Sequence, residues 1–256
     1  MQPKTPVQPA EPTFTGLYRL AGAGLLIAVV FVLLDIAMSF GGGDAPTGTM
    51  TAVDWFDQFN LNAFLGLRNL GLFNVINTTV FLPLYLALYL LHRRAAPVLA
   101  ILALVLYLLG AAVYDSNNRA LAMLSLSHRY EAASGAERDL IAAAGTAILA
   151  QAEDFTPGTF TGFFFSSAGS IMMMAAMLRG GLFGKGISLV GLAGSSLLLL
   201  FTILVSFAPQ TFDAAMLLAM VGGLLMLGWN VAMAVRMFRL GRTDSIAGKS
   251  LAPVTP

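Results

Sequence analysis

A charged side chain inside an apolar stretch marks the first place in this 256-residue chain where chemistry could occur. Asp35 lies in the outer third of the first apolar stretch, about 7 to 8 Å from its end at ~1.5 Å per helical residue. A charge in a membrane helix is costly, so such a residue is a functional candidate by default. Asp35 is therefore the first candidate for a binding role.

Polar side chains from other stretches are expected at the same depth. Asn74, Asn77 and Thr78 are spaced by three and four residues, so one helical face carries all three. This convergence predicts a polar cavity that opens outward and binds a ligand. The candidate ligand-binding residues are Asp35, Asn74, Asn77, Asp115, Asn118 and Arg119.

A structural role would explain the same residues. Asp35 could cap or pair with a neighbouring helix, and asparagines can form hydrogen bonds between membrane helices. Asp115 and Arg119 are four residues apart, which is the spacing of an ion pair within one helix. The sequence leaves the binding and the structural interpretations open.

Side chains for metal or covalent chemistry are scarce. His128 and Glu131 are three residues apart and could offer two ligands on one helical face, but a metal site usually has three or four. His92 lies among arginines at the opposite membrane boundary and is expected to contact lipid headgroups. The chain has no cysteine, which excludes disulfides and thiol catalysis. We therefore predict no catalytic residue, metal or cofactor, and favour a role other than an enzyme.

Long apolar stretches must position these residues. The chain is 57% hydrophobic and only 11% charged, so most of its surface does not face water. A membrane helix needs about 20 apolar residues, and backbone groups in lipid must bond within the segment. The sequence therefore predicts an all-α membrane protein with a six-transmembrane-helix bundle. The predicted spans are 17–40, 71–91, 97–114, 158–178, 186–208 and 211–238.

The basic residues predict the orientation of this bundle. Cytoplasmic loops carry the excess of Lys and Arg, and most of the fourteen basic residues lie at one set of helix ends. These residues are Lys4, Arg19, Arg93, Arg94, Arg179, Lys185, Arg236, Arg239, Arg242 and Lys249. We expect both termini in the cytoplasm, with disordered segments at 1–15 and 241–256 flanking a membrane domain at 16–240.

Two long connectors are expected outside the cytoplasm. The first carries Trp55, Phe56 and Phe59, which share one helical face and predict a short helix in the membrane interface, with the aromatics as anchors. The second, 115–157, predicts a helical hairpin between spans three and four. The third span should continue unbroken to Tyr130. A second helix should start at a capping box in 134–137.

The second helix of the hairpin has an apolar face at helical spacing. This face is predicted to pack on its own hairpin and the top of the bundle, or else on a partner subunit. Its residues are Leu140, Ile141, Ala144, Ile148, Ala152 and Phe155.

Packing signals occur within the spans. Gly162, Ser166 and Ser170 are four residues apart, with Gly169 beside them, and small residues at this spacing let helices approach closely. Pro83 is expected to free a carbonyl near Thr79 and to kink the second span. The methionines at 172–174 and 177 are interpreted as core or lipid-facing residues.

Three short motifs carry a resemblance to a known family. They are YRLAG at 18–22, RNLG at 68–71 and GLFGKG at 181–186. Together with the order of the spans, they resemble an uncharacterised family of bacterial membrane proteins, the domain of unknown function 4386, over about 15–240. The resemblance implies a six-helix protein of the bacterial inner membrane. It implies no known activity and no catalytic residues.

Three functions fit the sequence. The favoured one is a non-enzymatic membrane protein that binds a small or lipidic ligand, or a partner subunit, through the outer cavity. A small transporter or channel would need a polar path that continues to the cytoplasmic side. A membrane-embedded, metal-dependent enzyme would use Asp35, Asp115 and His128. The net charge of +1 gives no basic surface for nucleic acid, so the expected surroundings are the lipid bilayer and these partners.

Overall fold

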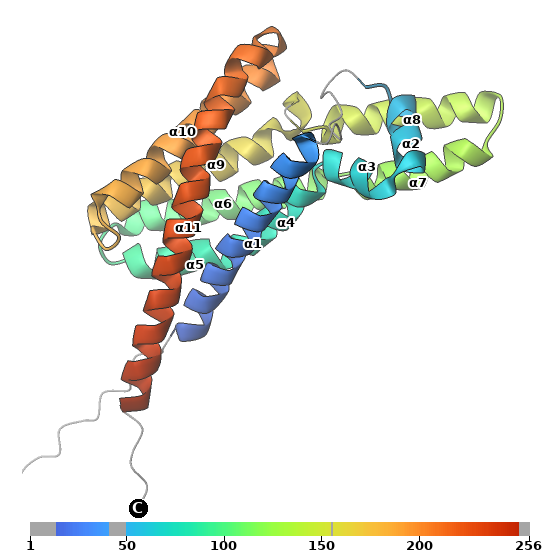
Figure 1. The fold of residues 1–256 in the computed structure, drawn as a ribbon. Coiled ribbons are helices and arrows are strands. Elements are labelled where there is room, and N and C mark those ends of the chain that lie inside the picture. The colour runs from blue at the N-terminus through green and yellow to red at the C-terminus, as the bar shows by residue number, and fades with distance from the viewer. Residues whose placement is uncertain (1–13, 41–49, 155, 251–256) are drawn as a thin grey trace, which may run out of the picture.

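The computed structural model describes residues 14–40, 50–154 and 156–250, with side chains for 14–38, 50–154 and 156–242. All regular secondary-structure elements in the described residues are helices (Figure 1). The elements are α1 (Thr15–Phe40), α2 (Ala52–Leu61), α3 (Ala63–Asn69), α4 (Leu72–Val80), α5 (Leu82–His92), α6 (Pro97–Asn117), α7 (Ala120–Ala132), α8 (Ala136–Ala152), α9 (Pro157–Gly180), α10 (Lys185–Phe207), the 3-10 helix η1 (Pro209–Thr211) and α11 (Phe212–Ser250).

Six helical runs in the described residues are long and apolar enough to cross a membrane. The first run lies within α1, the fifth coincides with α10, the sixth covers η1 and most of α11, and the second is divided between α4 and α5. The third and fourth join α6 to α7 and α8 to α9. Each predicted span begins within two residues of a helix start, so the all-helical character and the six candidate spans are confirmed.

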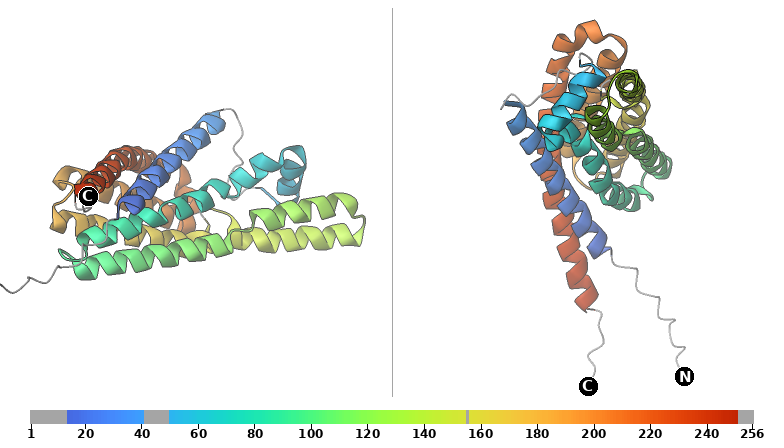
Figure 2. Two further views of the ribbon diagram at one scale, coloured as in Figure 1. Left: turned by 90° about the horizontal axis from the view of Figure 1, so that it is seen from below. Right: turned by 90° about the vertical axis from the view of Figure 1, so that its right-hand side faces the viewer.

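The six spans close into a ring. In order around it, α5 packs on α6, α6 on α9, α9 on α10, α10 on α11, α11 on α1 and α1 on α5. One end of the ring carries the α7–α8 hairpin and is called the hairpin end (Figures 1 and 2). The other end carries the start of α1 and the turns at 93–96 and 181–184 and is called the terminal end. The spans are not parallel to one another, and α11 runs across α6 and α9 in the view of Figure 1.

Small residues let α6 and α9 approach closely, as their spacing predicts. A Cβ atom added to Gly169 would lie 2.7 Å from the Tyr107 backbone nitrogen and 2.8 Å from the Ala103 carbonyl oxygen. A Cβ atom on Gly162 would lie 2.8 Å from the Cβ of Tyr114. Because larger side chains would separate the two backbones, glycine is required at both positions.

The second span is broken at Phe81, where α4 ends and α5 begins. Pro83 lies in the first turn of α5 and has no N–H to continue the ladder, so the helical run is interrupted at the position where the sequence predicts a kink. Tyr107 Oη donates to the Thr78 carbonyl oxygen at 3.0 Å, which satisfies a carbonyl near the break. Opposite the break, Gly24 of α1 has no Cβ and so leaves room for the Val80 carbonyl oxygen.

The centre of the ring is filled by large side chains. Tyr85 of α5 and Tyr107 of α6 stack with ring centroids 3.6 Å apart, and the Tyr85 hydroxyl forms a hydrogen bond with that of Ser170 on α9. Fully buried methionines fill much of the remaining space: Met173, Met174, Met177, Met233 and Met237. The methionines are thus core residues, and flexible thioethers fill irregular gaps between helices well.

The cap at the hairpin end, formed by α2, α3, α7 and α8, has a hydrophobic core of its own. Its core residues are Ala52, Trp55, Phe56, Phe59, Leu70, Ala120, Met123, Ile141 and Leu149. Figure 2 shows α7 extending the line of α6 while α8 lies beside it and leads back to α9. The cap therefore continues the α6–α9 pair beyond the ring, and α2 packs across it.

The structure corrects the prediction of an interfacial aromatic helix. The helix α2 forms, and a capping box of Thr51 and Asp54 starts it. Hydrogen bonds from the Thr51 hydroxyl and backbone N–H hold the pKa of the Asp54 carboxyl below its usual range. However, Trp55, Phe56 and Phe59 are buried in the core of the cap and do not serve as interface anchors.

Three details of the hairpin also differ from the predictions. The third span is interrupted at Asn118, whose extended backbone ends α6, before α7 begins at Ala120. No capping box forms in 134–137, because Gly135, with a φ of 58°, precedes α8 and provides no side-chain cap. Leu140 is exposed, and the buried face consists of Ile141, Gly145, Leu149 and Ala152. Phe155 lies outside the described residues.

The ends of the described chain can be compared with the terminal segments predicted to be disordered. The helix α11 ends at Ser250, so it runs through most of the segment 241–256 for which the sequence predicts disorder. Most of the segment 1–15 lies outside the described residues, and α1 begins at Thr15.

Enlarging Gly169 should weaken the α6–α9 contact. We expect Gly169→Ala to lower the free energy of unfolding in detergent by about 1–3 kcal/mol, because the new methyl overlaps backbone atoms of α6. Gly223→Ala in α11 is the matched control, since no atom lies within 4 Å of its added Cβ. It should be neutral or gain up to ~1 kcal/mol from better helix propensity. Equal stability of the two variants would contradict a close approach of α6 and α9 at Gly169.

Candidate functional site

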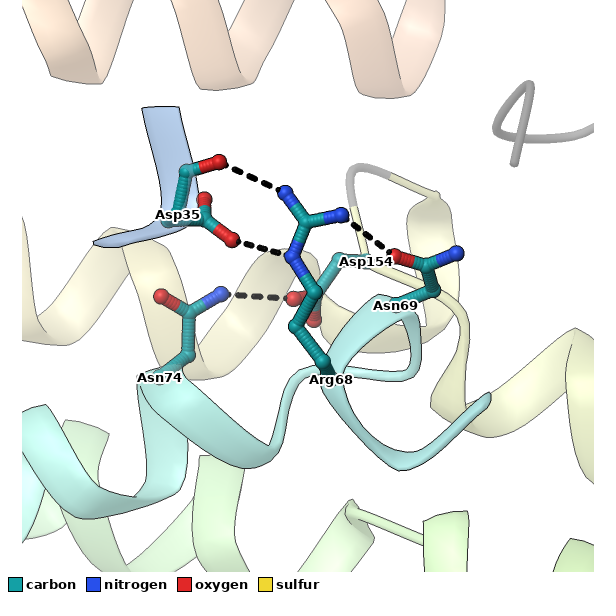
Figure 3. Close-up of polar contacts among 5 residues, drawn as sticks. All are labelled: Asp35, Arg68, Asn69, Asn74 and Asp154. Atoms are coloured by element: carbon teal, nitrogen blue, oxygen red, sulfur yellow. Dashed lines mark hydrogen bonds and ion pairs between the residues drawn. The ribbon is translucent and has the colours of Figure 1, made fainter. Parts of the chain in front are cut away.

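Polar side chains from five parts of the chain meet where the ring joins the cap. They come from α1, α3, α4, α6 and the connection between α8 and α9, and Figure 3 shows five of them. We call this group the polar layer. Its members are Asp35, Arg68, Asn69, Asn74, Thr78, Tyr114, Asp115, Asn118 and Asp154.

Arg68 of α3 holds Asp35 of α1 at two points (Figure 3). Arg68 Nε donates to Asp35 Oδ1 at 2.7 Å, and Nη2 donates to the Asp35 backbone carbonyl at 2.8 Å. Nη1 donates to Asn69 Oδ1 at 2.9 Å. The arginine side chain is only 3% exposed, whereas that of Asp35 is 52% exposed. A buried guanidinium thus fixes a carboxylate that stays accessible from outside the protein.

Asp154, just before α9, is the buried acid of the polar layer. Its Oδ2 accepts a hydrogen bond from Asn74 Nδ2 at 2.7 Å. The Tyr114 hydroxyl lies 2.7 Å from Oδ1 and 2.9 Å from Oδ2. A buried carboxylate is tolerated when donors surround it in this way, so Asp154 joins α4 and α6 to the start of α9.

Gly71 allows these groups to come together. Its backbone has a φ of 83°, a left-handed conformation that favours glycine. An added Cβ would lie 2.9 Å from Asp154 Oδ2 and 3.2 Å from Asn118 Nδ2, and would also overlap the Tyr114 hydroxyl. The side chain of Asn118 donates to the Leu70 carbonyl at 2.8 Å, and its Oδ1 accepts from the Ala120 N–H at 3.2 Å. One asparagine therefore ends α6, starts α7 and fixes the entry to α4.

Four of the predicted ligand-binding residues lie in the polar layer and two do not. Asp35, Asn74 and Asn118 have the contacts above, and Asp115 accepts a hydrogen bond from the Thr78 hydroxyl at 2.7 Å. Asn77 lies on α4, and its buried Oδ1 has no hydrogen-bond partner among the described residues.

Arg119 lies apart from the polar layer. It is exposed, and it precedes α7 at the interruption of the third span. Because α6 ends at Asn117, the continuous helical turn that would bring Arg119 to Asp115 does not form.

Four residues of the polar layer are not among the predicted site residues: Arg68, Asn69, Tyr114 and Asp154. Arg68 and Asp154 lie in connectors, where nothing in the local pattern distinguishes a buried charge from a solvated one. The sequence signal for Asp154 is its place three residues before Pro157, which directly precedes the fourth predicted span. Its partners come from 40 and 80 residues away, which only the tertiary structure can reveal.

The histidines lie far from the polar layer. His128 and Glu131 are exposed on α7, and the described residues contain no group of three or more His, Cys, Asp or Glu side chains that could hold a metal ion. His92 is fully buried against Phe183, and its Nδ1 lies 2.8 Å from the Leu88 carbonyl oxygen. The expectation that His92 contacts lipid headgroups is therefore wrong.

These observations define an all-helical protein with six helices long and apolar enough to cross a membrane. A family model described as Domain of unknown function (DUF4386) matches residues 20–233. The chain belongs to this family, which confirms the resemblance carried by its three motifs. No curated protein and no solved structure matches the chain.

Removing the hydroxyl of Tyr114 should destabilise the polar layer. We expect Tyr114→Phe to lower the free energy of unfolding by about 1.5–3 kcal/mol, because Asp154 loses a donor in a buried position. The measurement is equilibrium unfolding in nonionic detergent. Tyr130→Phe is the matched control, since it keeps the ring contacts with Phe56 and Arg138. If both variants lose the same amount, the Tyr114–Asp154 hydrogen bond contributes nothing specific.

Proposed function

We propose that the chain is a non-enzymatic binding protein of a bacterial cytoplasmic membrane, with both termini in the cytoplasm and the cap outside. The basic residues of the turns at the terminal end support this orientation: Arg93, Arg94, Arg179 and Lys185 all lie there. The cytoplasmic side of membrane proteins carries the excess of Lys and Arg. The polar layer then lies towards the outer face of the membrane.

The proposed ligand is a small amphiphile with a positively charged group. The observation that carries this proposal is the half-exposed carboxylate of Asp35, which the buried Arg68 holds in place. A fixed, accessible carboxylate needs little reorganisation to accept a cation or a hydrogen-bond donor. Asp115 and Asp154 add two further acidic groups to the layer, so it has more acids than bases and favours a cationic partner.

The surroundings of Asp35 favour an apolar body for the ligand. Leu33, Leu34 and Ile36 on both sides of it along α1 are exposed large hydrophobic residues. In a membrane, these side chains contact lipid tails or an apolar ligand, whereas Asp35 contacts its head. A ligand of this kind reaches the site from within the outer leaflet.

The other two functions receive less support from the structure. A transport path would have to pass the centre of the ring, where Met173, Met177 and Met233 are fully buried. An enzyme using His128 with Asp35 and Asp115 would need His128 close to the polar layer, and this histidine is exposed on α7. A binding role requires neither a path nor a distant side chain.

Neutralising Asp35 should abolish the preference for a cation. The probe is octylammonium, and octanol is its uncharged counterpart; binding is measured by calorimetry on the full chain in nonionic detergent. We expect Asp35→Asn to weaken octylammonium binding at least about tenfold, which corresponds to ~1.4 kcal/mol. Octanol binding should not change, because the asparagine oxygen can still accept the hydrogen bond from Arg68.

Asp213→Asn is the control for a general charge effect. Asp213 is an exposed acid in the first turn of α11, also at the hairpin end. Its neutralisation should leave octylammonium binding within about twofold of the wild type. Equal binding to the wild type and to Asp35→Asn, with equal melting temperatures, would show that Asp35 only joins α1 to the cap.

A further inference from the structure

A second polar site lies at the terminal end, where α5 turns into α6. A shallow, open cavity of about 390 Å³ lies beside this turn. Its lining residues are Tyr89, Arg93, Arg94, Pro97, Val98 and Ile101. None of these residues belongs to the polar layer or takes part in the ligand binding proposed for it.

The lining divides the cavity into a basic side and an apolar side. Arg93 and Arg94 are both exposed, and Tyr89 lies one helical turn before Arg93 on α5. Val98 and Ile101 of α6 are 66% and 46% exposed. Two guanidinium groups at one side match a phosphate oxygen pair, since arginine binds phosphate through parallel hydrogen bonds.

We infer that this cavity binds an anionic phospholipid, with the lipid phosphate at Arg93 and Arg94 and one acyl chain along α6. The arginines supply the charge complementary to the phosphodiester, and the Tyr89 hydroxyl provides a further donor. Basic pockets between membrane helices are the sites at which acidic lipid headgroups bind.

The outer surface of α6 provides the track for the acyl chain. Val98, Ile101, Val105 and Leu108 follow each other at spacings of three and four residues, and all four are exposed. This row runs from the cavity towards the hairpin end along one face of the span. A free phosphate ion would use the arginines alone, so the apolar row is what favours a lipid over an inorganic anion.

The site is also at the correct depth for a headgroup. Arg93 and Arg94 follow the last residue of α5, and Pro97 begins α6, so the cavity lies at the boundary of two membrane-crossing runs. Charged arginine heads at span ends reach the headgroup region while their stems cover apolar surface. This inference uses only the membrane location and does not depend on a ligand at Asp35.

Native mass spectrometry of the full chain in nonionic detergent tests the inference, with phosphatidylglycerol as the probe and phosphatidylcholine as the reference. The wild type should bind phosphatidylglycerol at least about tenfold more tightly than phosphatidylcholine. Arg93→Gln with Arg94→Gln should remove this preference. Val98→Trp should also weaken phosphatidylglycerol binding, because it fills the cavity while every charge stays in place.

The control is Arg179→Gln with Lys185→Gln, which removes the same charge from the other turn at the terminal end. It should retain phosphatidylglycerol binding within about twofold. Equal losses in the two double variants, or no preference in the wild type, would overturn the site in favour of general attraction. Displacement of the lipid by inorganic phosphate of equal affinity would assign the cavity to a free anion. If the arginine variant fails to fold, Val98→Trp decides alone.

Discussion

The close contact between α6 and α9 determines where the other parts of the protein can lie. Gly162 and Gly169 bring the two backbones together, and this pair continues beyond the ring as α7 and α8. The cap is therefore an extension of two spans and not a separate unit resting on them. Tyr114 and Asp115 lie at the end of α6, Asn118 directly follows it, and Asp154 lies just before α9, so the same contact aligns the polar layer.

The polar layer pairs polar groups with one another at the junction between the ring and the cap. Buried carbonyls and carboxylates in this region need partners within the protein. Asp154 satisfies this requirement with donors from two helices, and the Leu70 carbonyl does so with Asn118. Asp35 differs because half of its side chain is exposed although Arg68 holds its carboxylate, which is why it carries the proposed function.

The sequence predicts the spans well because apolar length and backbone hydrogen bonding are local properties of each segment. It also predicts that Asp35 and Asn74 lie in one group of polar side chains, as in Figure 3, and it predicts the small-residue face of α9. It does not predict what each face contacts. The periodicity of Trp55, Phe56 and Phe59 defines a helical face, and the same pattern suits a membrane interface or a protein core. The burial of His92 and Asp154 cannot be predicted for the same reason, since it depends on segments far away in the chain.

The interruption at Phe81 divides the second span into two helices, α4 and α5, whereas α9 and α10 each run without a break. Its segment towards the hairpin end, α4, is attached through Asn74 to Asp154, whereas Tyr85 on α5 packs at the centre of the ring. Because Pro83 has no N–H, a backbone hydrogen bond that would resist bending is missing between α4 and α5. Bending at Phe81 therefore costs less than bending within an unbroken helix, so α4 can follow the cap while α5 keeps its contacts at the centre of the ring.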